Sequence, residues 1–226
     1  MLNDFISLFF PPCCLLCKTP LIKSEKLICT TCFLELPLTH AHLEEDNSVA
    51  EKFYGKIALK HAVAFYKFRK GSKVQQLLYQ LKYKNKPQIG EIVGRKYGLI
   101  LRDKKWHKAF DLIIPVPLGS TKLRQRGYNQ SVFFAKGLSE ALAIPWSNQC
   151  LKRIKETLSQ TSKDRLARWK NVATVFSVEN AKMIRGQRIL LVDDVVTTGA
   201  TLEACALSLL AAESKEISVA ALAVAT

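Results

Sequence analysis

Two adjacent carboxylates follow a short apolar run near the end of this 226-residue chain. The run, residues 189–192, is typical of a buried parallel strand, and Asp193 and Asp194 come directly after it. Ligands of open α/β sheets bind beyond the carboxyl ends of the strands. Carboxylates at such an end are suited to accept hydrogen bonds from the vicinal hydroxyls of a ribose. We predict this role for both aspartates, as the catalytic pair.

The loop after the carboxylates predicts an anion site. It combines hydroxyls with one glycine and then enters a helix expected over about 201–212. A glycine lets the backbone approach a ligand closely, and the first amides of a helix bind anions. We predict 5′-phosphate contacts from Val196, Thr197, Thr198, Gly199, Ala200 and Thr201.

Two other sites with similar sequences are disfavoured. A dinucleotide site requires the pattern G-x-G-x-x-G after its strand, and this chain lacks it there. A phosphoacceptor receiver domain carries its aspartate pair near its start, whereas only 32 residues follow Asp194. The phosphoribosyl interpretation is therefore favoured.

A basic segment follows a second strand, expected over residues 111–116. Prolines fix the path by which that strand ends. Guanidinium and amide donors beside a glycine suit a diphosphate group. We interpret residues 120–129 as a loop at the same end of the sheet as the carboxylates, and predict diphosphate contacts from Pro117, Leu118, Arg126, Gly127 and Asn129. The alternative is a surface loop of solvated charges.

Five of the seven cysteines fall between residues 13 and 32. Cys14-x2-Cys17 and Cys29-x2-Cys32 can place four thiolates around Zn²⁺, which closes every coordination position and predicts a structural ion. The spacing Cys13-x3-Cys17 is also permitted, so the pattern leaves open whether Cys13 or Cys14 is the ligand. The alternative is a small core of reduced cysteines.

Strand and helix patterns alternate along the remaining chain. Strands are expected over 62–68, 111–116, 189–192 and 217–224, and helices over 74–83, 89–101, 130–142 and 201–212. This alternation predicts an α/β fold with a parallel sheet covered by helices on both faces. A composition change over 40–55 is typical of a linker. We divide the chain into a zinc knuckle, 1–45, a basic linking or hood region, 46–108, and a sheet domain, 109–226.

The net charge of +15 is concentrated in one stretch, because residues 52–108 hold 16 Lys or Arg against two acidic residues. Such a field attracts nucleic acid or a phosphate-rich small molecule, unless it is a solvated helix face. Aromatic residues interleaved with these lysines could stack on bases, although the two phenylalanines fit a core equally well: Phe65, Tyr66, Phe68, Tyr79 and Tyr83.

No apolar run reaches the roughly 18 residues of a membrane span. The first residues carry Asp4 and no basic segment, which disfavours a signal peptide. We therefore expect a cytoplasmic protein without a transmembrane segment.

Residues 192–201 resemble the 5-phosphoribosyl-1-diphosphate (PRPP) signature of type I phosphoribosyltransferases. Residues 115–130, together with Lys82-Tyr83 and the cysteine pairs, resemble the ComF family, and the resemblance spans about residues 11–225. It implies a type I phosphoribosyltransferase fold behind a four-cysteine zinc module, with PRPP and Mg²⁺ as ligands. The family pattern also favours Cys14 over Cys13.

The resemblance implies two kinds of function. One is a phosphoribosyltransferase that transfers the sugar to a nitrogen acceptor. The other is a competence factor that binds single-stranded DNA during uptake and uses the pocket for sensing. Residues 153–170 match the flexible loop of these enzymes, with Gln160, Arg165 and Arg168 as candidate contacts. A homodimer is expected only by analogy with similar folds.

Overall fold

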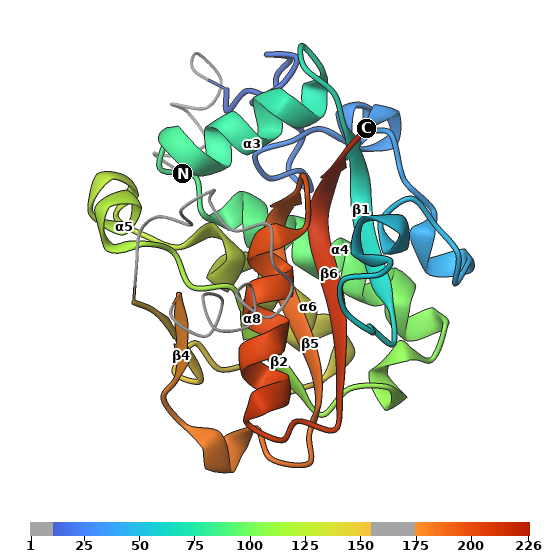
Figure 1. The fold of residues 1–226 in the computed structure, drawn as a ribbon. Coiled ribbons are helices and arrows are strands. Elements are labelled where there is room, and N and C mark those ends of the chain that lie inside the picture. The colour runs from blue at the N-terminus through green and yellow to red at the C-terminus, as the bar shows by residue number, and fades with distance from the viewer. Residues whose placement is uncertain (1–10, 155–174) are drawn as a thin grey trace.

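The computed structural model describes residues 11–154 and 175–226 of the chain. Its centre is a four-stranded sheet in the order β1-β6-β5-β2, and every neighbouring pair is parallel. Figure 1 shows the strands side by side, with their carboxyl ends at the top of the view. The sheet confirms the predicted α/β fold class, and its strands are β1 (Ala62–Phe68), β2 (Leu112–Pro115), β5 (Arg188–Val196) and β6 (Glu216–Ala225).

Helices cover both faces of this sheet. Helix α8 (Ala200–Ala211) lies on one face, and α4 (Gln88–Asp103) and α6 (Gln130–Leu142) lie on the other (Figure 1). The four apolar residues of β5 before the carboxylates, 189–192, are completely buried as a result. A strand covered on both faces is apolar at successive positions, which explains the continuous run in the sequence.

Helices α4 and α6 pack with their backbones in contact. A Cβ atom at Gly94 would lie 2.4 Å from the carbonyl oxygen of Phe134, and one at Gly137 would lie 2.2 Å from that of Glu91. No side chain fits at either position. This close approach holds the first turn of α6 firmly, and that turn contributes to the site described below.

Helix α3 (Lys73–Tyr83) connects the cysteine module to the carboxyl end of the sheet (Figure 1). The Ser72 side chain caps its first turn by accepting a hydrogen bond from the Gln75 amide. Leu77 and Leu81 are buried on one side of the helix, whereas Tyr79 and Tyr83 are exposed on the other. The sequence pattern predicted this helix correctly.

The prediction of a linker over residues 40–55 is wrong, because this segment is packed. It contains two short helices, η1 (Ala41–Leu43) and η2 (Ala50–Phe53). The Asn47 side chain is buried and bonds to the carbonyls of Ala41 and Glu44. Phe53 is also buried. The small polar residues of segment 40–55 keep it compact through hydrogen bonds from side chains to the backbone.

The basic stretch 46–108 contributes to the sheet and its cover, since β1 and α4 both come from it. The division into 1–45, 46–108 and 109–226 stays a prediction about units of folding. The other elements are α2 (Thr30–Glu35), η3 (Trp106–Lys108), α5 (Ser120–Arg126), an antiparallel pair β3 (Leu151–Arg153) and β4 (Phe176–Val178), and η4 (Ala181–Met183). Among the described residues, none of these helices is long and apolar enough to cross a membrane.

Candidate sugar-phosphate site and metal centre

The two carboxylates lie at the carboxyl end of β5, beside the first turn of α6. The Asp193 carboxylate accepts a hydrogen bond from the Ser131 hydroxyl at 2.9 Å and another from the Asp194 amide at 2.8 Å. Ser131 follows Asn129 of the predicted diphosphate-binding segment by two residues. Parallel pairing of β2 with β5 places Pro115 opposite Val192. The structure therefore brings the two predicted halves of the site to one edge of the sheet.

The electrostatics of the two aspartates differ. Burial, together with the neighbouring charge of Asp194, raises the pKa of Asp193 to about 7. Asp194 instead forms an ion pair with Lys82, whose Nζ lies 2.9 Å from its Oδ1. The folded protein therefore disfavours the charged form of Asp193, whereas the Asp194 carboxylate has Lys82 of α3 as its cationic partner.

The loop 196–201 has the geometry of a helix-start anion site. Gly199 has a φ of 81°, in the left-handed region, and directly precedes α8. A Cβ there would also lie 2.8 Å from Cε1 of Phe53, so glycine is required for two reasons. Thr197, Thr198 and Ala200 are exposed at the mouth of this loop. Val196 is buried beneath it and Thr201 is half-buried in the first turn of α8.

A lysine from far away in the sequence lies beside this loop. Lys56 Nζ donates a hydrogen bond to the Thr198 carbonyl at 3.2 Å and another to the Lys52 carbonyl at 2.6 Å. The loop itself has no basic residue. The structure therefore supplies, next to the amides of α8, the positive charge that the local sequence lacks.

The basic segment after β2 is partly helical, and its interpretation as a loop over 120–129 is wrong. Residues 120–126 form α5, and Gly127 ends it with a left-handed φ of 76°. Lys, Leu, Arg and Gln are strong helix formers, so this short helix needs no apolar stripe in its sequence. Pattern analysis missed it because the segment has no 3.6-residue apolar periodicity.

The predicted diphosphate contacts lie at the corner between α5 and α6. Asn129 caps α6, because its Oδ1 accepts from the Ser131 amide and its Nδ2 donates to the Val116 carbonyl. Arg126 donates to Gln130 at 2.7 Å, and its guanidinium lies 5.3 Å from the centre of the Tyr83 ring. Pro117 and Leu118 are half-buried after β2, and Gly127 is exposed. Of these five residues, Pro117 and Leu118 closely follow β2, and Asn129 bonds to the residue after that strand.

Sequence reasoning missed four contributors to this site: Phe53, Lys56, Lys82 and Ser131. Each meets the site through a partner distant in the chain, so no local spacing identifies it. Lys82 was noted only as part of the resemblance to a family, without a role. The predicted loop residues Gln160, Arg165 and Arg168 lie outside the described residues.

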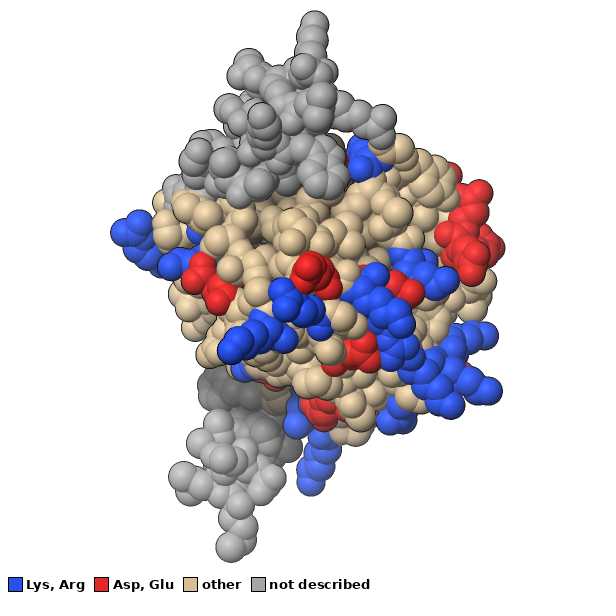
Figure 2. Space-filling model, turned by 60° about the horizontal axis from the view of Figure 1, so that its bottom comes forward, with Lys and Arg blue, Asp and Glu red and all other residues tan. Residues whose placement is uncertain are grey.

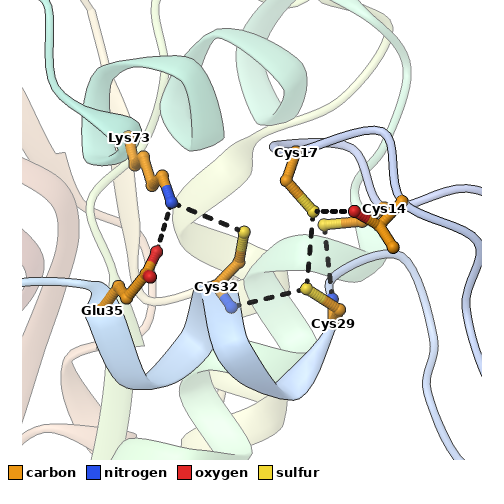
Figure 3. Close-up of polar contacts among 7 residues, drawn as sticks. Cys14, Cys17, Cys29, Cys32, Glu35 and Lys73 are labelled. Atoms are coloured by element: carbon orange, nitrogen blue, oxygen red, sulfur yellow. Dashed lines mark hydrogen bonds and ion pairs between the residues drawn. The ribbon is translucent and has the colours of Figure 1, made fainter.

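The second site is a cluster of four cysteines at the start of α2 (Figure 3). The sulfur atoms of Cys14, Cys17, Cys29 and Cys32 all lie within 4.8 Å of one another. Cys13 is exposed and its thiol donates to the Pro11 carbonyl instead. The alternative that the spacing left open is therefore decided in favour of Cys14.

These thiols fit a structural zinc ion. Zn–S bonds of about 2.3 Å in a tetrahedron separate the sulfurs by about 3.8 Å. Cys17 and Cys29 already lie 3.6 Å apart, and the amides of Cys29 and Cys32 donate to the sulfurs of Cys14 and Cys29. Amide donors of this kind stabilise thiolate ligands. Four protein ligands leave no position for a catalytic water.

A lysine also faces this cluster. Lys73, the first residue of α3, has its Nζ 3.8 Å from the Cys32 sulfur and forms an ion pair with Glu35 (Figure 3). Its positive charge would offset part of the negative charge of four thiolates. Helix α3 therefore begins at the cysteine cluster and reaches Asp194 through Lys82 in its last turn.

Comparisons with known proteins find one family model and several relatives that match this chain. The phosphoribosyl transferase domain family matches residues 129–225. Competence protein F of Haemophilus influenzae is 39% identical over 132 residues, which cover 56% of this chain and 57% of that protein. DNA utilization protein YhgH of Escherichia coli K12 is 27% identical over 208 residues, which cover 84% of this chain and 87% of that protein. The first match thus spans little more than half of its relative.

A solved structure described as the allosteric regulatory enzyme of purine biosynthesis also resembles part of the chain. It aligns with 64% of this chain and 30% of its own, at 18% identity and a TM-score of 0.45.

Proposed function

This chain is a ComF-like protein with a type I phosphoribosyltransferase domain, and from that premise we propose that it binds PRPP with Mg²⁺ and transfers the phosphoribosyl group to a nitrogen acceptor. One observation carries the proposal. The aspartate pair, the helix-start anion loop and the basic corner all meet at one edge of the sheet, where the Ser131 hydroxyl bonds to Asp193. A sugar with a phosphate at each end requires these three environments together.

The phosphate and the ribose would lie along the end of β5. The exposed hydroxyls of Thr197 and Thr198 and the first amides of α8 hold the 5′-phosphate, supported by the helix dipole. The two aspartates accept hydrogen bonds from the ribose hydroxyls. Ser131 fixes Asp193 in this orientation, because its hydroxyl bonds to the carboxylate from the α6 side.

The diphosphate would lie toward the corner between α5 and α6, where Arg126 and the backbone around Gly127 supply hydrogen-bond donors. Mg²⁺, when bound with PRPP, neutralises charge on the leaving diphosphate. In the reaction, the bond between C1 of the ribose and the diphosphate oxygen breaks, and the diphosphate leaves with the electron pair. The acceptor nitrogen forms the new bond to C1 and releases its proton. The protein mainly positions the groups and stabilises the developing charge.

Calorimetry with PRPP tests this proposal directly. We expect saturable binding in the presence of Mg²⁺ and much weaker binding in EDTA, because the diphosphate charge is then unscreened. A panel of amines and nucleobases should contain an acceptor that releases diphosphate from PRPP. Absence of binding at millimolar PRPP with Mg²⁺ contradicts the proposal; binding without any diphosphate release supports a sensing role over turnover.

A second candidate function, binding of single-stranded DNA, is favoured by two exposed tyrosines on α3. Tyr79 and Tyr83 are 49% and 61% exposed, and their ring centres are 5.4 Å apart. Lys84 Nζ lies 5.7 Å from the centre of the Tyr79 ring. Neighbouring aromatic rings with cations form stacking platforms for unpaired bases. The names of both relatives, which refer to competence and DNA utilization, fit such a partner.

The other aromatic residues of the basic stretch do not join this surface. Phe65 and Tyr66 are 5% and 1% exposed, and Phe65 stacks on Tyr97 at 4.6 Å in the core. Burial therefore assigns Phe65 to the core, which the sequence had left open, and the expectation that Tyr66 stacks on bases is wrong. Figure 2 shows a gathering of Lys and Arg at the lower right of another face of the molecule, with acidic side chains nearby. Charge alone therefore does not identify the surface that would bind DNA, and the exposed tyrosines are the reason for proposing α3.

The double substitution Tyr79→Ala with Tyr83→Ala is expected to weaken binding of an unstructured oligonucleotide by about tenfold or more, since stacking contributes about 1–3 kcal/mol per base. Fluorescence anisotropy with a labelled oligothymidylate at several salt concentrations measures this. Tyr54→Ala is the matched control, because Tyr54 is 57% exposed on a different segment. Equal losses in both proteins, or no loss in either, would count against an α3 platform.

A further inference from the structure

The ion pair between Lys82 and Asp194 places a cation inside the proposed site from outside the matched domain. Lys82 belongs to α3, whereas the family match begins at residue 129. The pair is 2.9 Å long, and its side chains are only 20% and 14% exposed. A pair so withdrawn from water is less screened than a surface contact, and removing one partner leaves the other charge uncompensated.

The corner between α5 and α6 holds the carboxyl end of α3 over the site. The Tyr128 hydroxyl donates to the Leu81 carbonyl, and the Arg126 guanidinium lies over the Tyr83 ring at 5.3 Å. These contacts flank Lys82 in the sequence on both sides. Lys82 therefore lies between the aspartate pair, which would bind the ribose, and the corner that is predicted to bind the diphosphate.

The polarity of α3 makes a cation necessary at this position. The carboxyl end of a helix carries partial negative charge. That end, with Lys82 in its last turn, approaches the two carboxylates. Without Lys82, an anionic ligand would meet two acids and the negative end of a dipole. With it, the free protein has a neutralised Asp194 and an ammonium group close to the corner.

We propose that Lys82 exchanges partners when the phosphoribosyl ligand binds, leaving Asp194 and contacting the diphosphate. This inference rests on the proposed function. In the free protein the ammonium neutralises one of two adjacent carboxylates, which cannot both hold a charge cheaply. In the complex it adds a charged donor to the diphosphate, and Asp194 becomes available to the ribose hydroxyls. The flexible stem and three rotatable donors of lysine suit such an exchange.

The test compares two ligands that differ in the diphosphate. PRPP and ribose 5-phosphate, each with Mg²⁺, are titrated by calorimetry into the wild-type chain, Lys82→Met, Lys82→Arg and the control Lys70→Met. Lys70 is exposed in the segment before α3 and gives the same change in net charge. We expect the affinity of Lys82→Met for PRPP to fall at least about tenfold and its affinity for ribose 5-phosphate to stay unchanged. The reason is that a hydrogen bond to a charged group is lost only with PRPP.

Lys82→Arg should keep most of the preference for PRPP, and Lys70→Met should behave as wild type. The proposed exchange would be overturned if Lys82→Met lost equal affinity for both ligands or gained affinity for both. It would also be overturned if Lys82→Arg lost as much affinity for PRPP as Lys82→Met. Thermal unfolding of each variant establishes that it is folded, with Lys82→Gln as a replacement if Lys82→Met is not. A wild-type protein that binds neither ligand contradicts the proposed function itself, which separates the two failures.

Discussion

Replacing both aspartates with asparagine is expected to lower the affinity for PRPP with Mg²⁺ by about a hundredfold or more. Two charge-assisted hydrogen bonds to the ribose hydroxyls are lost, and each is worth about 1.5–3 kcal/mol. The fold should survive, because asparagine has nearly the same shape as aspartate. Its amide oxygen at position 193 can still accept from the Ser131 hydroxyl. Calorimetry measures the affinity and thermal unfolding measures the stability.

The stability of this double variant has its own physical basis. Burial raises the pKa of Asp193 to about 7, which means that the folded state disfavours its charge. A neutral side chain at position 193 removes that cost, which offsets the cost of leaving the Lys82 ammonium without its Asp194 partner. Asp103→Asn is the matched control, since Asp103 lies at the exposed end of α4 and gives the same chemical change. Unchanged PRPP affinity in the double variant would remove the aspartates from the site.

Substituting a cluster cysteine is expected to produce the largest structural effect. Cys32→Ser should abolish binding of the one zinc ion per chain that the four thiols can hold. Zinc binding in small modules contributes about 10–16 kcal/mol to folding, so residues 11–40 should lose their structure with the metal. Elemental analysis measures the zinc content, and limited proteolysis reports cleavage between residues 11 and 40.

The chain provides a matched control for this substitution. Cys13→Ser changes a neighbouring thiol in the same way, but Cys13 is exposed and bonds to the Pro11 carbonyl outside the cluster. It should retain one zinc per chain and resist proteolysis as the wild type does. Wild-type protein purified without chelators and found free of metal, or equal zinc loss in both variants, would contradict the assignment.

Loss of zinc is also expected to affect the proposed sugar-phosphate site, which lies at the carboxyl end of α3. Lys73 at its start contacts Cys32 and Glu35, and Lys82 at its end contacts Asp194. A helix transmits a displacement of one end to the other, because its turns are rigidly hydrogen-bonded. The Cys32→Ser protein therefore offers a second measurement, in which its PRPP affinity is compared with that of Cys13→Ser.

Much of the fold follows from patterns within a few residues. The continuous apolar run before Asp193 predicted a strand buried on both faces, and Ile189 to Val192 are indeed fully buried in β5. The alternation of strands and helices predicted the parallel sheet. Where the local signal was weak, prediction failed. Residues 40–55 were assigned as a linker because they are polar, but Asn47 and Phe53 are buried there.

What the sequence determined by itself is the local chemistry: paired carboxylates after a strand, a glycine at a helix start, and two cysteine pairs at metal-binding spacing. Each depends on residues adjacent in the chain, so spacing alone reveals it. The tertiary structure decided which thiol joins the cluster, that Phe53 packs against Gly199, and that Lys82 pairs with Asp194. Such contacts join residues far apart in the sequence, and only the packing of complete elements determines which distant side chains meet.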